Sequence, residues 1–183
     1  QRSSGFLQET DRERIKGAWT LAMKTVVQEI VSRHITTKRG GMPHVHYHDL
    51  HELYYMAKGS TTYYIGDKIY HVEKGNFVFI PKGVLHKTDE YNDNNERVLL
   101  SFGDILFSNE LQEVREELYN SRVIYVQEEQ LPYFEKLLQQ IETEYHREDG
   151  YSSLMMNLYI TELLVQLCRY KYSFKPVLSG TDR

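Results

Sequence analysis

Between residues 26 and 107 the chain alternates short runs of apolar and β-branched residues with turn residues, a pattern typical of β-strands. Gly66-Asp67 separates two such runs by two residues, which indicates a β-hairpin. Residues 77–80 are continuously apolar, as expected of a strand buried on both faces. Many short strands separated by turns favour a barrel or sandwich over a βαβ fold. We expect strands at residues 26–37, 53–57, 61–65, 68–73, 77–80 and 97–102, with 105–107 continuing the last.

After residue 107 the apolar positions recur every three or four residues, which is typical of amphipathic helices. We expect helices at residues 110–119, 128–147 and 152–172, and another near the start at 9–24. The last helix carries two apolar stripes, Met156, Ile160, Leu163, Leu167 and Tyr170 on one side and Leu154, Leu158, Val165 and Cys168 on the other. One stripe can pack on the barrel or on the preceding helix. The second favours a second subunit, although a helix wedged between two elements of its own chain would also bury both.

Composition and charge narrow the class of protein. A chain of 183 residues can form one well-cored domain with a helical appendage. Its net charge of −4 argues against a broad grip on a nucleic-acid backbone. No apolar run approaches the roughly 20 residues of a membrane helix, and no secretory signal is visible. The single cysteine, Cys168, excludes an internal disulfide and favours a reducing compartment, so we expect a cytoplasmic protein without membrane contact.

Two glycine-bracketed histidine motifs follow one another in the middle third of the chain. The first places His46, His48 and Glu52 between Gly40 and Gly59, and the second places Pro81, Gly83 and His86 after Gly75. Alternate residues of a strand face the same side, so His44, His46 and His48 are expected to share a face. Glu52 begins the next strand after a short turn, and His86 would enter from a later strand. Three imidazoles and one carboxylate form a ligand set of borderline hardness for a divalent transition metal such as zinc, nickel, iron or manganese.

Each of these residues alone also has a purely structural interpretation. Single strand histidines are often hydrogen-bonded, and Glu52 alone could pair with Lys58 or Arg97. A buried carboxylate among inward imidazoles would, without a metal, need extensive hydrogen bonding to offset the cost of burial. A metal acquired incidentally would not by itself indicate catalysis. We assign no role to the remaining histidines, His34, His51, His71 and His146.

The two motifs resemble the cupin signature, although Glu90 stands where the second motif usually ends with Asn. This resemblance implies a small β-barrel or jelly roll in which the metal, when present, is held by His46, His48, Glu52 and His86. The longer pattern, which includes Glu52-Leu-Tyr-Tyr-Met-Ala-Lys-Gly59 and Gly75-Asn-Phe-Val-Phe-Ile-Pro81, is similar to the N-terminal domain of AraC-type bacterial transcriptional regulators. The likeness covers roughly residues 30–172.

In AraC-type regulators the barrel receives a small effector, the following helices form a homodimer, and a C-terminal double helix-turn-helix domain binds DNA. No helix-turn-helix pattern occurs in this sequence, and its polar tail is similar to a linker cut short. We therefore expect a fragment of a longer protein whose DNA-binding domain is absent from this chain. The expected divisions are an N-terminal helical segment (1–25), a cupin barrel (26–107), a helical dimerisation region (108–172) and a truncated linker (173–183).

The sequence thus favours a sensor module over an enzyme. Strand alternation from Glu52 and His86 makes Tyr54, Met56 and Thr88 candidate effector-binding residues. The effector itself stays open among a sugar, an aromatic acid and a metal ion. The alternative is a stand-alone metal-dependent cupin enzyme, such as a dioxygenase or isomerase, in which the metal acts as a Lewis acid or binds oxygen.

Overall fold

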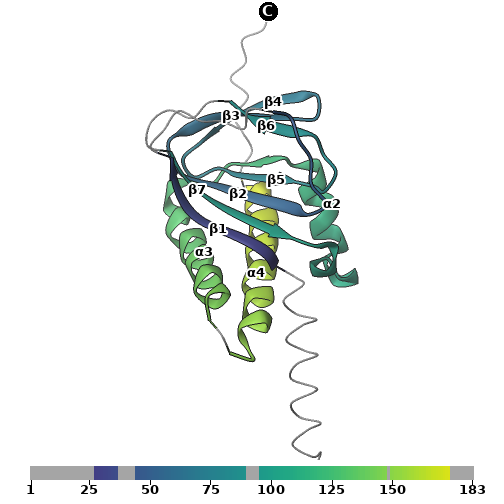
Figure 1. Ribbon diagram of the computed structural model, residues 1–183, viewed down its shortest axis with the longest axis vertical. Helices are drawn as coiled ribbons and strands as arrows, with labels where there is room; N and C mark the ends of the chain where they lie inside the picture. Colours follow the sequence, from purple (N-terminus) through teal and green to yellow (C-terminus); the bar gives the residue numbers. More distant parts are fainter. Residues whose placement is uncertain (1–26, 37–43, 90–94, 148, 174–183) are drawn as a thin grey trace, which may run out of the picture.

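The computed structural model describes residues 27–36, 44–89, 95–147 and 149–173, and describes residues 27–36 and 171–173 by their backbone alone. Two antiparallel sheets face each other (Figure 1). The larger sheet has the strand order β1-β7-β2-β5-β8, and the smaller has the order β4-β3-β6. The strands are β1 (Val27–Thr36), β2 (His51–Lys58), β3 (Ser60–Ile65), β4 (Lys68–Glu73), β5 (Phe77–Ile80), β6 (His86–Thr88), β7 (Asn95–Phe102) and β8 (Val123–Ile124).

Side chains from both sheets form a first core in the space between them. This core consists of Tyr54, Met56, Tyr63, Ile65, Val72, Val78 and Ile80. Along β2, Tyr54 and Met56 lie in this core, whereas their neighbours Leu53 and Tyr55 lie on the opposite face of the sheet. Strand alternation thus divides β2 between two apolar environments. All four residues of β5 are buried, which confirms the strand predicted from the continuous apolar run at 77–80.

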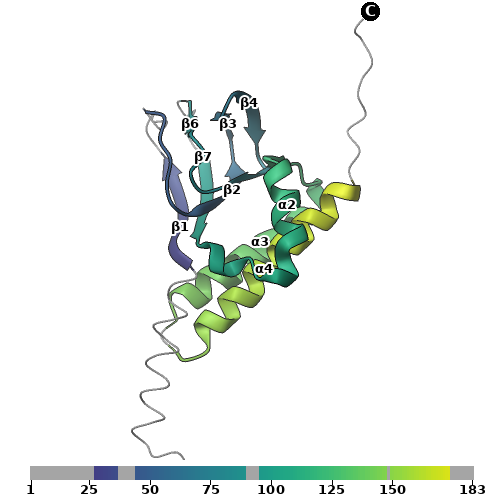
Figure 2. The same ribbon diagram turned by 90° about the vertical axis from the view of Figure 1, so that its right-hand side faces the viewer.

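Helices cover the outer face of the larger sheet and complete a three-layer arrangement (Figure 2). They are α2 (Gln112–Asn120), α3 (Leu131–Tyr145) and α4 (Ser152–Ser173), with single 3-10 turns at Asp104–Leu106, Asn109–Leu111 and Glu128–Gln130. Phe79 and Phe102 of the sheet share a second core with Phe134 of α3 and Leu163 of α4. The predicted fold class, mainly β with C-terminal helices, is confirmed.

Two glycines fix the sharp turns on either side of β3. Gly66 has φ +60° in the two-residue hairpin, and Ile65 pairs with Lys68 across it, which confirms the predicted hairpin. Gly59 has φ +89° between β2 and β3, and a Cβ atom there would lie 1.7 Å from Asn95 Oδ1. Both positions therefore favour glycine because of the left-handed backbone, and the second also because of crowding.

The structure corrects two local predictions. Residues 105–107 do not continue the last strand, because its pairing with β1 and β2 ends at Phe102 and the chain enters the 3-10 turn Asp104–Leu106. Residues 44–50 are not a continuous strand either, because β6 is three residues long and the segment pairs with it at one bridge, His46 with His86. In addition, β8 lies between the helices predicted at 110–119 and 128–147 and extends the larger sheet.

Other predictions concern segments that lie wholly or partly outside the described residues. These include the helix at 9–24, Glu90, and most of the tail at 173–183. The division into domains therefore stays a prediction. Within the part of the chain that the structure covers, no helix has the length and apolar character needed to cross a membrane.

Candidate metal centre

The predicted metal ligands gather at one end of the sandwich, where three segments meet. Glu52 lies near the start of β2, His86 starts β6, and His46 and His48 lie in the loop before β2. The backbones of His46 and His86 exchange two hydrogen bonds, of 3.1 and 2.9 Å. The loop is held further by Gly83, whose N–H donates to the His48 carbonyl at 2.8 Å. Segments distant in sequence thus present their side chains to one point.

Three of the four predicted ligands form a compact group. One ligand atom each from His48, Glu52 and His86 lies within 4.8 Å of the others. The ring centroids of His48 and His86 are 4.9 Å apart. The His46 ring lies 4.4 Å from that of His86 but 6.2 Å from that of His48, so His46 stands at the margin of the group. His44, which was expected to share their face, is exposed.

Backbone carbonyls orient the imidazoles for metal binding. Nδ1 of His86 donates to the Val84 carbonyl at 2.8 Å, and Nδ1 of His48 donates to the Leu50 carbonyl at 2.6 Å. In a neutral His86 this leaves Nε2 with a free lone pair, the form that binds a metal, whereas Nε2 of His48 faces the Glu52 carboxylate and would have to lose its proton to bind one. His86 Nε2 is buried and has no hydrogen-bond partner among the described residues. A buried lone pair without a partner is costly, and a cation at this point would remove the cost. The residues present therefore fit a metal ion.

The charges in the group also favour a cation. Nε2 of His48 lies 3.1 Å from Glu52 Oε2, and this hydrogen bond raises the pKa of His48, with burial opposing the effect. Glu52 is 3% exposed, and its other oxygen accepts a hydrogen bond from the Tyr63 hydroxyl at 3.3 Å. Burial lowers the pKa of His86, so its ring favours the neutral form. A buried carboxylate faced by a neutral imidazole is a suitable environment for a divalent ion.

The predicted effector-binding residues lie inside the sandwich. Tyr54 and Met56 are 0% exposed and Thr88 is 2% exposed. Tyr54 follows Glu52 on the same face of β2, and its hydroxyl contacts Met56 Sδ at 3.7 Å. Its ring meets that of Tyr63 edge to face at a centroid distance of 5.3 Å. The alternation placed these residues on the interior face, and their contact with an effector stays a prediction.

His51, to which the sequence assigned no role, is 0% exposed on the outer face of β2. Its Nε2 donates to Asp104 Oδ1 at 2.8 Å, and its Nδ1 accepts the backbone N–H of Lys82 at 3.2 Å. Burial lowers the pKa of His51, although Asp104 opposes the effect, so the ring binds as a neutral donor and acceptor. The sequence did contain a signal for this position. His51 directly precedes Glu52, and strand alternation places adjacent residues on opposite faces of the sheet, so an inward Glu52 implies that His51 faces the helical layer. His71 and His146 are exposed.

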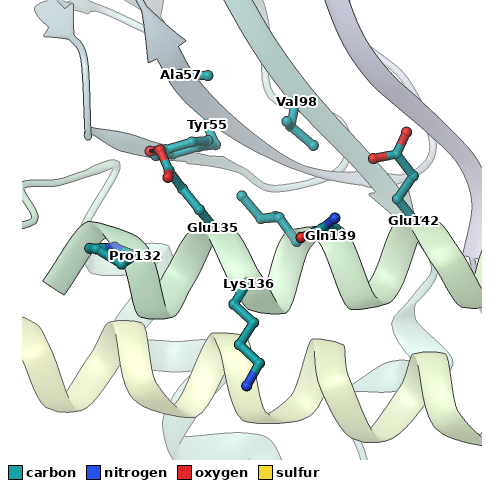
Figure 3. A pocket seen from close by; sticks show the side chains of 9 residues that line it. Tyr55, Ala57, Val98, Pro132, Glu135, Lys136, Gln139 and Glu142 are labelled. Atoms are coloured by element: carbon teal, nitrogen blue, oxygen red, sulfur yellow. Dashed lines mark hydrogen bonds between the residues drawn. The ribbon is translucent and has the colours of Figure 1, made fainter.

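A cavity separates the larger sheet from α3. It has a volume of about 480 Å³ and is lined by Tyr55, Ala57, Val98 and residues of α3. Figure 3 shows Tyr55 and Glu135 pointing toward each other across it. The Tyr55 hydroxyl donates to Glu135 Oε1 at 2.8 Å, and burial, with this bond, raises the pKa of Tyr55. The strand that carries Glu52 is therefore joined directly to the helical layer.

One family model and several solved structures are similar to this chain. Residues 33–102 match the family model described as the cupin domain. The AraC-like transcriptional activator CuxR aligns over 73% of this chain and 46% of its own, with a TM-score of 0.51 and 11% identity. Oxalate decarboxylase from Bacillus subtilis aligns over 40% of this chain and 20% of its own, with a TM-score of 0.33 and 27% identity. An RmlC-like cupin from Shewanella frigidimarina covers 46% of this chain and 73% of its own, with a TM-score of 0.37 and 18% identity.

A search of curated proteins found no match. The alignments cover about a fifth of the oxalate decarboxylase chain and less than half of the CuxR chain, so this chain spans only part of those proteins. The family match and the two facing sheets show that the chain contains a cupin domain, to which a helical layer is added.

Proposed function

We propose that this chain is the effector-binding and dimerising part of an AraC-type transcriptional regulator and that its cupin domain holds a divalent metal. His48, Glu52 and His86 would hold the ion, with His46 completing the set when its ring turns inward. Imidazole and carboxylate ligands suit zinc, nickel, iron and manganese alike. The bound metal would supply a fixed positive charge that orders the loop before β2. DNA would be bound by a separate C-terminal domain.

The observation that carries this proposal is the extent of the likeness to CuxR. The cupin model matches residues 33–102, whereas the structural alignment with CuxR covers 73% of the chain and so extends well beyond the cupin residues. An identity of 11% supports a common fold alone. The regulatory role is supported by that fold together with the sequence pattern from His46 to His86 that is similar to AraC-type regulators.

One face of α4 is suited to a second copy of the chain. Leu154 and Leu158 are 46% and 54% exposed, and Tyr151, one turn earlier, is 75% exposed. On the opposite face Ile160 and Leu163 are fully buried against the rest of the protein. Exposed apolar side chains aligned along one helix favour association. Cys168, which was placed on the second stripe, is instead buried, and its Sγ contacts the Val114 carbonyl.

Strand β2 offers a physical route from the barrel to these helices. It presents Glu52 to the metal group, while Tyr55 on its other face donates to Glu135 of α3. An effector alters the dimer only if it binds two arrangements of the protein with different affinity. A shift of β2 on ligand binding would move the hydroxyl that α3 binds, and this gives the two arrangements different contacts.

Sedimentation of a charged variant tests the dimer. In the double variant Leu154→Glu/Leu158→Glu, two carboxylates would have to be buried in the interface, so the dimer should dissociate to monomer. The matched control is Ile69→Glu, because Ile69 is 67% exposed on β4 rather than on α4. A wild-type monomer, or a double variant that stays dimeric, would contradict the proposed interface.

A metal-dependent cupin enzyme is the second candidate, and the compact three-residue group favours it. Three protein ligands leave coordination positions for water and a substrate, which is the arrangement of catalytic metal sites. The reading frame of the gene beyond Arg183 separates the two candidates. A double helix-turn-helix there would support the regulator. A stop codon at that point, with turnover of a small molecule by the iron- or manganese-loaded protein, would support the enzyme.

A further inference from the structure

A small cavity lies between the β3–β4 hairpin and the end of α2. Arg122, which also lines it, directly precedes β8 at the edge of the larger sheet. The cavity has a volume of about 250 Å³. Its lining comes from the turn between β3 and β4, from Val84, from the end of α2 and from Arg122. None of the proposed metal ligands lines it, so it is a separate site.

Arg122 is the unusual residue of this cavity. Its side chain is half-buried, and its Nη1 atom is fully buried without a hydrogen-bond partner in the described part of the chain. A guanidinium carries five N–H donors and stays charged, so a buried nitrogen without an acceptor is unfavourable. Burial lowers the pKa of Arg122. Its position is fixed, because the Arg122 carbonyl accepts the N–H of Phe79 at 2.8 Å.

Apolar and aromatic side chains form one part of the lining, and the polar Asp67, Lys68 and Asn120 form the rest. Ile65 is 3% exposed, Val84 packs against the same core, and Tyr70 and Tyr119 lie close to the guanidinium. The only acidic residue in the lining, Asp67, is exposed in the hairpin turn beside Lys68 and forms no ion pair with Arg122 in the residues that the structure covers. An inorganic anion would use the cation but not these apolar walls. An organic anion would use both.

We propose that this cavity binds a small organic carboxylate, whose two oxygens are held by Arg122 and whose apolar body lies between Tyr70, Tyr119 and Val84. Arginine binds carboxylates through two parallel hydrogen bonds, and the pairing is strong where water is excluded. The volume of about 250 Å³ is below the roughly 300–1,000 Å³ of pockets for drug-sized ligands, which restricts the ligand to a small molecule.

The site is also placed to influence the helical layer. Tyr119 and Asn120 at the end of α2 line the cavity, and α2 packs on α4, where Cys168 Sγ contacts the carbonyl of Val114. A carboxylate held between β4 and α2 would therefore stabilise one position of α2 against α4. That this carboxylate acts as the effector rests on the proposed function. That the cavity binds a carboxylate rests on the cavity alone.

Calorimetric titration of the chain with acetate, benzoate and hexanoate tests the site, with benzamide as the uncharged analogue of benzoate. We expect benzoate and hexanoate to bind more tightly than acetate, and benzamide to bind at least tenfold more weakly than benzoate. Arg122→Gln should weaken benzoate binding at least tenfold. The matched control is Arg169→Gln, because Arg169 is exposed on α4 and should leave binding unchanged.

NMR titration of the wild-type protein gives a second measurement that needs no variant. Benzoate should shift the side-chain signals of Arg122 and the amide signals of Tyr70 and Tyr119. The inference is overturned if no carboxylate of the panel binds, if benzamide binds as well as benzoate, or if Arg122→Gln retains affinity. Phosphate bound more tightly than benzoate would overturn the carboxylate class.

The metal content and the oligomeric state separate this inference from the proposed function. Arg122→Gln should retain both, because Arg122 lies apart from the metal group and from the exposed face of α4. If the wild-type protein is a metal-loaded dimer that does not bind benzoate, the carboxylate site is wrong and the regulator proposal is unaffected. If the protein binds benzoate as a monomer and the gene has a stop codon after Arg183, the carboxylate site is supported and the regulator proposal is contradicted.

Discussion

Removal of the His86 imidazole is the most direct test of the metal centre. His86→Ala deletes the ligand atom that is most deeply buried and lacks a partner, and it leaves Glu52 and His48 in place. The side chain is 1% exposed, so water cannot readily take its place. We expect the variant to fold and to lose most of its affinity for a divalent metal.

The magnitude follows from typical zinc sites. Four protein ligands together supply about 10–16 kcal/mol of binding free energy, or about 2.5–4 kcal/mol each if shared evenly. Since 1.4 kcal/mol is a factor of ten, loss of one ligand raises Kd by roughly 60- to 700-fold. With free metal at about 100 times the wild-type Kd, bound metal stabilises the wild type by about 2.7 kcal/mol and the variant by less than about 0.6 kcal/mol. For a chain of this size, that corresponds to a melting shift of about 5–11 °C against about 1–2 °C.

Thermal melting with zinc chloride and with EDTA measures this difference. Each variant is compared with itself, so any direct effect of His86→Ala on the apo protein cancels. His71→Ala is the matched control, because His71 is exposed on β4 and should retain the full shift. His46→Ala should lose less than His86→Ala, since His46 stands at the margin of the group. An equal metal-dependent shift in His86→Ala and wild type would show that the proposed ligand set is wrong.

Two further predictions concern stability. Gly59→Ala should lower the free energy of unfolding by about 1–3 kcal/mol, because φ is +89° and the new Cβ would displace Asn95, and urea denaturation should show the loss; an unchanged midpoint would contradict the crowding. Tyr55→Phe removes the hydroxyl that donates to Glu135, and a double-mutant cycle with Glu135→Ala, which removes the acceptor, should give a coupling of about 1 kcal/mol. Additive losses in that cycle would show that the bond does not join the sheet to α3.

Local patterns were enough to predict the framework. The hairpin at Gly66, the strand at 77–80 and the helix along 152–172 follow from spacing within one segment, because turn geometry and side-chain periodicity are local properties. The glycine-bracketed histidines predicted which segments meet. Alternation from Glu52 likewise predicted that Tyr54 and Met56 lie between the sheets, as the structure has them.

What the tertiary structure decided was which of these side chains come together. His46 and His48 look equivalent in a strand, but their segment pairs only at one bridge, and His48 joins the compact group while His46 stands at its margin. The hydrogen bond of buried His51 depends on Asp104, and the cavity at Arg122 depends on the hairpin between β3 and β4; both partners are far away in the sequence. Burial and the lack of a partner arise from contacts between distant segments, and periodicity within one segment carries no information about those contacts.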